Sequence, residues 1–168
     1  RGLMASENES TPDDLEIIRH RDGWVELAAP NRAEFLDKID RLLAEICAAD
    51  LPEAEREELH YALSEICRNA WEWGNRKDER RMIRVSYCRF QDEVVFKIED
   101  EGEGFDPGSI PDPTHDLRTF LADRAASGKR AGGFGLHMVK RIMDRVVFND
   151  KGNVVILTKM LKRQGRGS

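Results

Sequence analysis

The chain has 168 residues, of which 40% are hydrophobic and 35% charged, a composition typical of one globular domain with a single core. Its formal net charge of -5 gives no general attraction to nucleic acid or to anionic membranes, so neither is expected as a partner. The sequence has no run of about 18 apolar residues that would predict a membrane-spanning helix. Its three widely spaced cysteines form no CxxC pair, which argues against a zinc or dithiol site and fits a reducing cytoplasm.

The first half of the chain predicts one strand and two helices. Residues 1–20 are polar and are expected to form a flexible tail, and Trp24–Ala29 alternates weakly as a strand does. Asn31 is a candidate N-cap for the first helix, and Pro52 starts the second, which ends at Gly74–Asn75. Apolar residues recur at helical spacing in the first helix at Phe35, Ile39, Leu42, Leu43 and Ile46.

The second half predicts two hairpins separated by irregular and helical segments. Met82–Phe90 and Val94–Ile98 alternate as paired strands, and the Gly- and Pro-rich Asp100–Pro113 follows them. The later segments are a short helix at Thr114–Ala126, a basic Gly-rich loop at Ser127–Gly133, a helix at Leu136–Asp144, and a hairpin of Val146–Phe148 with Val154–Lys159.

These elements predict one α/β domain over residues 21–162, followed by a flexible tail at 163–168. We expect a two-layer sandwich in which a mixed, mostly antiparallel sheet is covered by helices on one face.

Glu65 and Asn69 are the first candidates for chemistry. They are four residues apart on the second predicted helix, so they share a face beside its apolar stripe. An Asn carbonyl oxygen is a suitable Mg²⁺ ligand, and a carboxylate beside it can act as a general base. The alternative is an ordinary solvated pair on a helix flank, which the pair alone does not exclude.

The second candidate is the acidic, Gly-rich segment that directly follows a strand. Asp100 at the strand end can accept a hydrogen bond from an exocyclic amine, and Gly102 and Gly104 let the backbone approach a flat ring closely. The neighbouring acids would repel a phosphate, so the segment should face a base. The alternatives are a plain acidic turn or a weak calcium loop, although the EF-hand pattern is not met.

The third candidate is a Gly-rich stretch ahead of a helix. Its backbone N–H groups, together with the helix dipole, can bind an anion, and basic side chains can add charge at the outer phosphates. It matches neither a P-loop nor a dinucleotide fingerprint, and a flexible loop is the alternative. The residues are Lys129, Arg130, Ala131, Gly132, Gly133, Phe134, Gly135 and Leu136.

The order of these three elements resembles the N, G1 and G2 boxes of the GHKL ATPase superfamily, which has the Bergerat fold. Within it, the chain most resembles the bacterial anti-sigma-factor serine/threonine kinases, whose N box is similar to Glu65-Ile-Cys-Arg-Asn69-Ala70. The resemblance extends from about Trp24 to Leu161. It departs at Trp73, which stands where many relatives have His.

The resemblance implies ATP and Mg²⁺ as cofactors and a role for each matching residue. Asn69 would ligate Mg²⁺, Glu65 would be the catalytic base, and Asp100 would bind the adenine amino group. Residues 113–132 would form the ATP lid. The nucleotide site would comprise Asn69, Asp100, Gly102, Gly104, Phe105, Lys129, Arg130, Gly132, Gly133, Phe134, Gly135 and Leu136.

The resemblance further implies a cytoplasmic serine/threonine kinase that phosphorylates a small anti-sigma-factor antagonist and sequesters a sigma factor. A homodimer formed through the N-terminal strand and first helix is a further expectation of the same kind. Two alternatives stay open: the catalytic domain of a sensor histidine kinase, and a non-catalytic, nucleotide-gated binding module.

Overall fold

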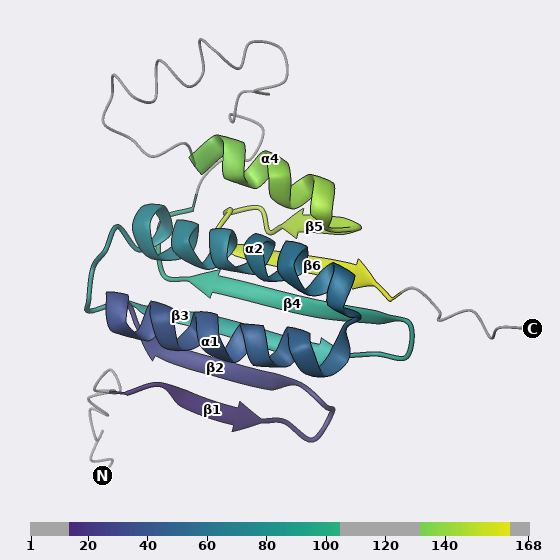
Figure 1. Cartoon of the computed structure of the whole chain (residues 1–168). Helices are drawn as coiled ribbons and strands as arrows, with labels where there is room; N and C mark the ends of the chain where they lie inside the picture. Colours follow the sequence, from purple (N-terminus) through teal and green to yellow (C-terminus); the bar gives the residue numbers. More distant parts are fainter. Residues whose placement is uncertain (1–13, 105–131, 162–168) are drawn as a thin grey trace, which may run out of the picture.

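The structure, a computed structural model, describes residues 14–104 and 132–161, and it has two layers (Figure 1). The strands are β1 (Glu16–Arg19), β2 (Val25–Pro30), β3 (Met82–Arg89), β4 (Glu93–Asp100), β5 (Arg145–Phe148) and β6 (Val154–Met160). They form one sheet in the order β1-β2-β3-β4-β6-β5, with every neighbouring pair antiparallel. The helices are α1 (Ala33–Asp50), α2 (Glu53–Asn69), its π-helical continuation η1 (Ala70–Gly74) and α4 (Gly132–Ile142). The helices cover one face of the sheet, which confirms the predicted sandwich.

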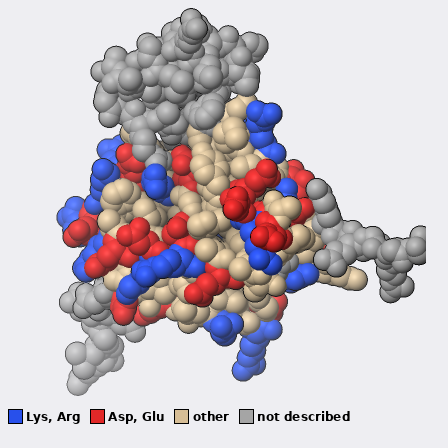
Figure 2. All heavy atoms as spheres, viewed as in Figure 1, with Lys and Arg blue, Asp and Glu red and all other residues tan. Residues whose placement is uncertain are grey.

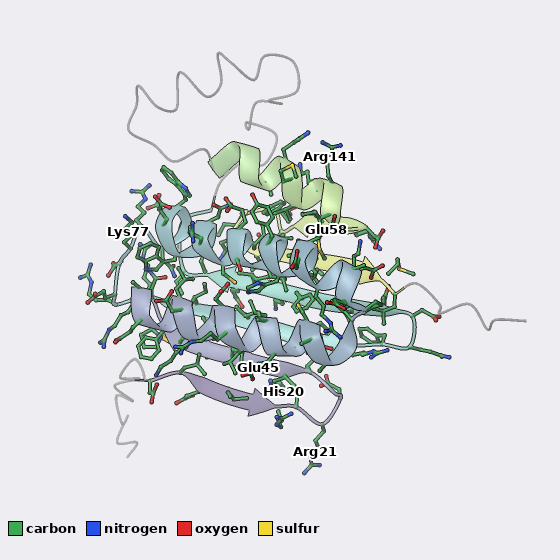
Figure 3. All side chains as sticks on the ribbon, viewed as in Figure 1. His20, Arg21, Glu45, Glu58, Lys77 and Arg141 are labelled. Carbon is green, nitrogen blue, oxygen red and sulfur yellow. The ribbon has the colours of Figure 1, made fainter. Side chains whose placement is uncertain are left out.

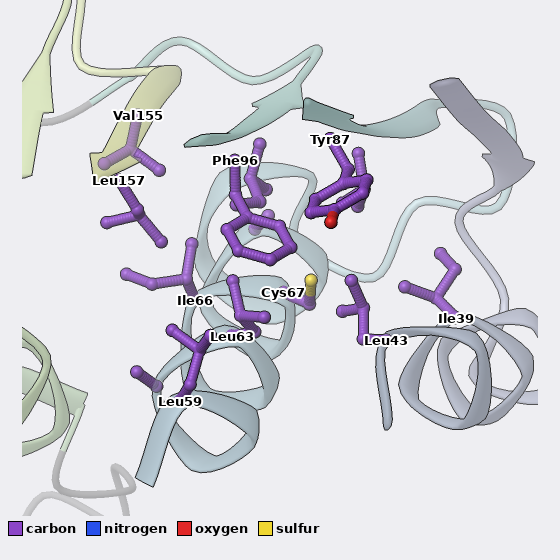
Figure 4. Close-up of a cluster of buried hydrophobic side chains, with 14 of the residues drawn as sticks. Ile39, Leu43, Leu59, Leu63, Ile66, Cys67, Tyr87, Phe96, Val155 and Leu157 are labelled. Carbon is purple, nitrogen blue, oxygen red and sulfur yellow. The ribbon is translucent and has the colours of Figure 1, made fainter. Parts of the chain in front are cut away.

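The hydrophobic core lies between the sheet and the helices. Each layer contributes apolar residues at the spacing of its own secondary structure. In β4 the residues Val94, Phe96 and Ile98 are buried, and they alternate with partly exposed neighbours. Helix α2 buries Leu59 and Leu63 against this surface, as Figure 4 shows. The periodicity of both elements therefore predicts which face each one buries.

The remaining helices complete the same core. Helix α1 buries Phe35, Ile39 and Leu43, and α4 buries Leu136 and Val139, with Met143 buried directly after its end. Both stripes agree with the apolar spacing of the sequence. Within residues 14–104 and 132–161, no helix combines the length and the apolar character that crossing a membrane requires.

The three cysteines, Cys47, Cys67 and Cys88, are all free and buried. Burial, with a smaller contribution from the charge of Asp40, raises the pKa of the Cys67 thiol to about 12. A thiol in this state forms little thiolate at neutral pH, so Cys67 acts as a small apolar residue in the core.

The N-terminal boundary is the first point at which the sequence prediction is wrong. Residues 16–19 were expected in a flexible tail, but they form β1 and pair with β2, from Glu16 opposite Ala28 to Arg19 opposite Val25. All four residues are exposed, and Ile17 is 51% exposed. A short edge strand that buries neither face leaves no alternation for the sequence to reveal.

Asn31 was predicted to cap the first helix, and this is also wrong. The N-cap position of α1 is Arg32, which makes no side-chain capping hydrogen bond, whereas Asn31 is 1% exposed and donates to the Trp71 carbonyl at 3.4 Å. Asn favours a cap because its side chain bonds to nearby backbone. Here a partner about forty residues away along the chain takes that side chain instead.

The fold predicts a large difference between two truncations. Leu63→Ala should lower the free energy of unfolding by about 2–5 kcal/mol, because it opens a cavity between α2 and the sheet. Ile156→Ala, at a 41% exposed position of β6, should cost less than about 1 kcal/mol. Urea unfolding of both variants measures the difference, and equal losses would contradict the described core.

Candidate nucleotide-binding site

Helices α2 and α4 meet at Glu65 and Gly135. Glu65 lies on α2 and is partly buried, and Gly135 lies in the first turns of α4. A Cβ atom at Gly135 would overlap the Glu65 carboxylate, so a side chain there would force Glu65 to move. The sequence places these residues in separate motifs, and the fold brings them into direct contact.

Asn69 follows Glu65 by about one turn, at the last position of α2. Its Oδ1 atom is buried and has no hydrogen-bond partner. Buried side-chain oxygens nearly always have a partner, so this oxygen is an acceptor available to a bound group. A neutral carbonyl oxygen fits the preference of Mg²⁺ for hard oxygen ligands, so Asn69 fits the predicted metal role.

The described residues contain no group of three or more His, Cys, Asp or Glu side chains arranged to hold a metal ion. Mg²⁺ bound with a nucleotide commonly takes one or two protein ligands and completes its octahedron with phosphates and water. A single amide oxygen is therefore sufficient as the protein's share of such a site.

Asp100, at the end of β4, lies against the π-helical turn that follows Asn69. It is 8% exposed, and a Cβ atom at Gly74 would overlap its carboxylate. Its Oδ1 atom accepts a hydrogen bond from the Gly102 N–H at 2.8 Å. Burial raises the pKa of Asp100 and outweighs the lowering by this bond and by the charges of Arg81 and Lys151. The result is a poorly solvated carboxyl group with an incomplete set of partners, suited to bind a polar group of a ligand.

Close backbone packing explains why glycine occupies positions 102 and 104, and the sequence did not reveal it. Gly102 packs so closely on the Gly74 carbonyl that a Cβ would overlap it. Gly104 has a φ of +82° and packs in the same way on the carbonyl of Lys151, in the β5–β6 turn. These glycines hold the loop between η1 and that turn, and their contact with a base stays a prediction.

Asn75 connects the elements around Asp100, although its place in the sequence predicted only the end of a helix. It is fully buried, and its Nδ2 atom donates to Asn31 Oδ1 at 3.0 Å and to the Met82 carbonyl at 2.9 Å. Its Oδ1 atom accepts from the Glu101 N–H at 2.8 Å. An Asn after a Gly is ordinary at a helix end, so no local signal marks its burial.

The Gly-rich segment begins a helix instead of preceding it, contrary to the prediction that the helix starts at Leu136. Helix α4 begins at Gly132, because its packing on α2 outweighs the low helix propensity of glycine. The backbone N–H groups of its first turn lack intrahelical partners and carry the positive end of the dipole. The Leu136 side chain belongs to the hydrophobic core, so any phosphate contact of Leu136 would come from its backbone.

Several predicted residues lie outside the described residues: Phe105, Lys129 and Arg130, together with the short helix Thr114–Ala126. Of Gly132, Gly133 and Phe134 the structure describes the helical backbone.

Acidic and basic side chains are interspersed over the helical face, as Figure 2 shows. In the turn after η1, for example, Asp78 pairs with Arg80 at 3.1 Å and with Arg81 at 3.7 Å. No broad single-sign surface is visible from this side, so phosphate binding here would depend on local groups such as the first turn of α4.

Residues 29–159 match a family model described as the histidine kinase-like ATPase domain. The chain belongs to this family. The matched segment runs from β2 to β6, so it contains the described candidate residues on α2, β4 and α4.

Curated relatives match most of the chain. The serine-protein kinase RsbW of Bacillus licheniformis is 28% identical over 143 residues, 84% of this chain and 88% of that protein. The RsbW of Bacillus subtilis is 26% identical over 146 residues, 86% and 89% of the two chains. The RsbW of Staphylococcus epidermidis is 27% identical over 144 residues, 84% and 89%. The chain is thus homologous to serine-protein kinases along most of its length.

Gly135→Ala tests the contact between α2 and α4. Helix propensity alone predicts a gain of up to about 1 kcal/mol in the free energy of unfolding. We expect the opposite, a loss of stability and of ATP binding, because the new methyl group displaces the Glu65 carboxylate. Thermal unfolding with and without ATP measures both.

The control is the double variant Glu65→Ala/Gly135→Ala, in which the truncated side chain leaves room for the methyl group. It should be at least as stable as Glu65→Ala alone. A Gly135→Ala protein that is more stable than wild type and binds ATP normally would contradict the described contact.

Asp100→Asn should stabilise the nucleotide-free protein at about pH 7. Burial raises the pKa of Asp100, so ionised Asp100 costs folding free energy that the neutral amide avoids. The advantage should shrink as the pH falls through the raised pKa and vanish below the ordinary Asp pKa of about 3.9, where wild-type Asp100 is protonated in both states. Thermal midpoints between about pH 7 and pH 3.5 measure this. Asp37→Asn, at an exposed position on α1, should show no such gain, and a destabilised Asp100→Asn would contradict the interpretation.

Proposed function

We propose that the chain is an ATP-dependent serine/threonine protein kinase of the anti-sigma-factor type, acting in the cytoplasm. Its substrate would be a small anti-sigma-factor antagonist, and its other partner a sigma factor. One observation carries the nucleotide-dependent part: the unpaired Asn69 Oδ1 lies one turn from Glu65, which contacts the first turns of α4. A homodimer formed through β2, the strand that the sequence predicted first, and α1 stays a prediction.

The geometry supports one orientation of ATP. The adenine amino group would bind Asp100, the phosphates would lie at the positive end of α4, and Asn69 lies on the helix that contacts both. Asn69 Oδ1 would hold Mg²⁺, which neutralises phosphate charge when bound. Asp100 also repels phosphate while it is ionised, so it favours this orientation over the reverse.

Glu65 would act as the general base of the transfer. As the serine hydroxyl oxygen forms a bond to the γ-phosphorus, the Glu65 carboxylate would take the hydroxyl proton, and the bond to the ADP oxygen breaks. The contact with Gly135 limits the positions of the carboxylate, so it stays near the first turns of α4.

A histidine kinase domain is the second candidate, because the family model takes its name from histidine kinases. That reading predicts phosphohistidine on a separate helical domain, and phosphohistidine is labile in acid. The serine kinase is preferred because the relatives that match 84–86% of this chain are named serine-protein kinases.

The test is transfer from γ-labelled ATP to candidate antagonist proteins, followed by acid treatment. We expect an acid-stable phosphoprotein, and Glu65→Gln should slow its formation by about 10²–10⁴-fold while ATP binding is retained. The matched control is Glu58→Gln, two turns earlier on the same helix and exposed (Figure 3), which should transfer at the wild-type rate.

Two outcomes would contradict the proposal in different ways. Tight ATP binding without transfer to any antagonist would leave the non-catalytic binding module as the better description. Transfer by Glu65→Gln at the wild-type rate would remove Glu65 from the role of base and leave the kinase assignment intact.

A further inference from the structure

The buried polar side chains of the described residues gather in one place. They are Asn31, Asn75 and Asp100, and all three lie where the end of η1 meets the loop after β4. Burying polar groups costs free energy unless each is paired, so such a cluster in an otherwise apolar interior needs a reason. We propose that Asn75 is a positioning residue that holds Asp100 in place for the nucleobase and thereby sets the preference for adenine. This inference rests on the proposed function.

Asn75 uses its whole amide group to join three elements. Both of its N–H groups are taken, one by Asn31 after β2 and one by the Met82 carbonyl at the start of β3. Its oxygen accepts the Glu101 N–H, which belongs to the peptide that directly follows Asp100. A side chain with no spare donor and three anchors has one position available to it.

Asn31 is in turn held by the backbone on both sides of the cluster. Its main-chain N–H donates to the Arg81 carbonyl at 3.0 Å, and its side chain donates to the Trp71 carbonyl at 3.4 Å. Asn75 is therefore anchored to the end of β2 and the start of β3. The Met82 N–H also donates to Glu101 Oε1, so the start of β3 holds Glu101 directly as well. The bond from the Glu101 N–H to Asn75 adds to this support.

Asn75 acts on Asp100 from two sides. Through Glu101 it fixes the peptide that leaves Asp100. Through its neighbour Gly74 it fixes the surface on which the Asp100 carboxylate and the Gly102 backbone both pack. The Asn75 N–H bonds to the Ala70 carbonyl at 2.7 Å, so the same residue also closes the π-helical turn. Truncating the Asn75 side chain would remove the bond from the Glu101 N–H and keep the backbone bond to Ala70, so it loosens the peptide that leaves Asp100.

A carboxylate accepts a hydrogen bond from the exocyclic amine of adenine, whereas inosine presents a carbonyl oxygen at that position and repels it. A site that pairs a substrate N–H rejects an analogue without it strongly, but only while its acceptor is held within about 0.5 Å of the right place. Base preference therefore reports the position of Asp100, which overall stability does not.

The experiment measures dissociation constants for ATP and inosine triphosphate, each with Mg²⁺, by calorimetry. Asn75→Ala should weaken ATP binding by about tenfold or more and inosine triphosphate binding by less than about threefold, so the preference for ATP falls. Leu43→Ala, a core truncation on α1, controls for loss of stability: it should lower the thermal midpoint and leave the preference unchanged.

Two further variants locate the effect. Asp100→Asn should abolish most of the preference, and adding Asn75→Ala to it should lower the preference no further, because both act through one contact. Asn31→Ala leaves Asn75 in place and removes one of its acceptors, so it should lower the preference in the same direction by a smaller factor. It carries the test if Asn75→Ala does not fold.

The outcomes separate this inference from the proposed function. A wild-type protein that binds ATP and inosine triphosphate equally well overturns the adenine contact of Asp100 and the positioning role with it. If wild type prefers ATP and a folded Asn75→Ala protein keeps that preference in full, the positioning role alone is overturned. Where Asn75→Ala does not fold, an Asn31→Ala protein that keeps the full preference overturns it in the same way. Equal weakening of both nucleotides by Asn75→Ala does the same, because it shows a general loss of the site.

Discussion

The close approach of helix α2 and its continuation η1 to two other elements is the constraint on which the site depends. At one end of the site the Glu65 carboxylate lies on Gly135 of α4, and at the other the Asp100 carboxylate lies on Gly74 of η1. Each contact places a carboxyl group where a Cβ atom would otherwise be. The distance between the two ends is then set by the helix itself, because the backbone hydrogen bonds of a helix make it a rigid spacer.

The core and the site use the same helix for different purposes. One face of α2 buries Leu59, Leu63 and Ile66 on the sheet, which fixes the rotation of the helix about its axis. That rotation leaves Glu65 and Asn69 at the margin of the core, where they are partly buried. The packing of α2 on the sheet thus helps to determine the direction of the two polar side chains.

The elements with a periodic apolar pattern could be predicted from the sequence. The features that depend on contacts between distant residues could not. The stripes of α1, α2 and α4 and the alternation of β3 and β4 follow from periodicity, so their elements and buried faces were predicted correctly. Strand β1 has no buried face to give such a pattern. For Asn31 and Asn75, local preference suggested a cap and a helix stop. Their actual partners are each other, 44 residues apart along the chain, and no local rule shows that bond.

The π-helical turn η1 also limits which length changes this region can tolerate. A π-helix uses about one more residue per turn than an α-helix, so it changes the angular relation between the residue before it and the residue after it. Here those residues are Asn69, with its unpaired oxygen, and Gly74–Asn75, which support Asp100. Deleting one residue between them would keep every side chain of the site and turn one half of it away from the other. Homologous chains that conserve the residues on both sides are therefore expected to conserve the number of residues between them as strictly as their identity.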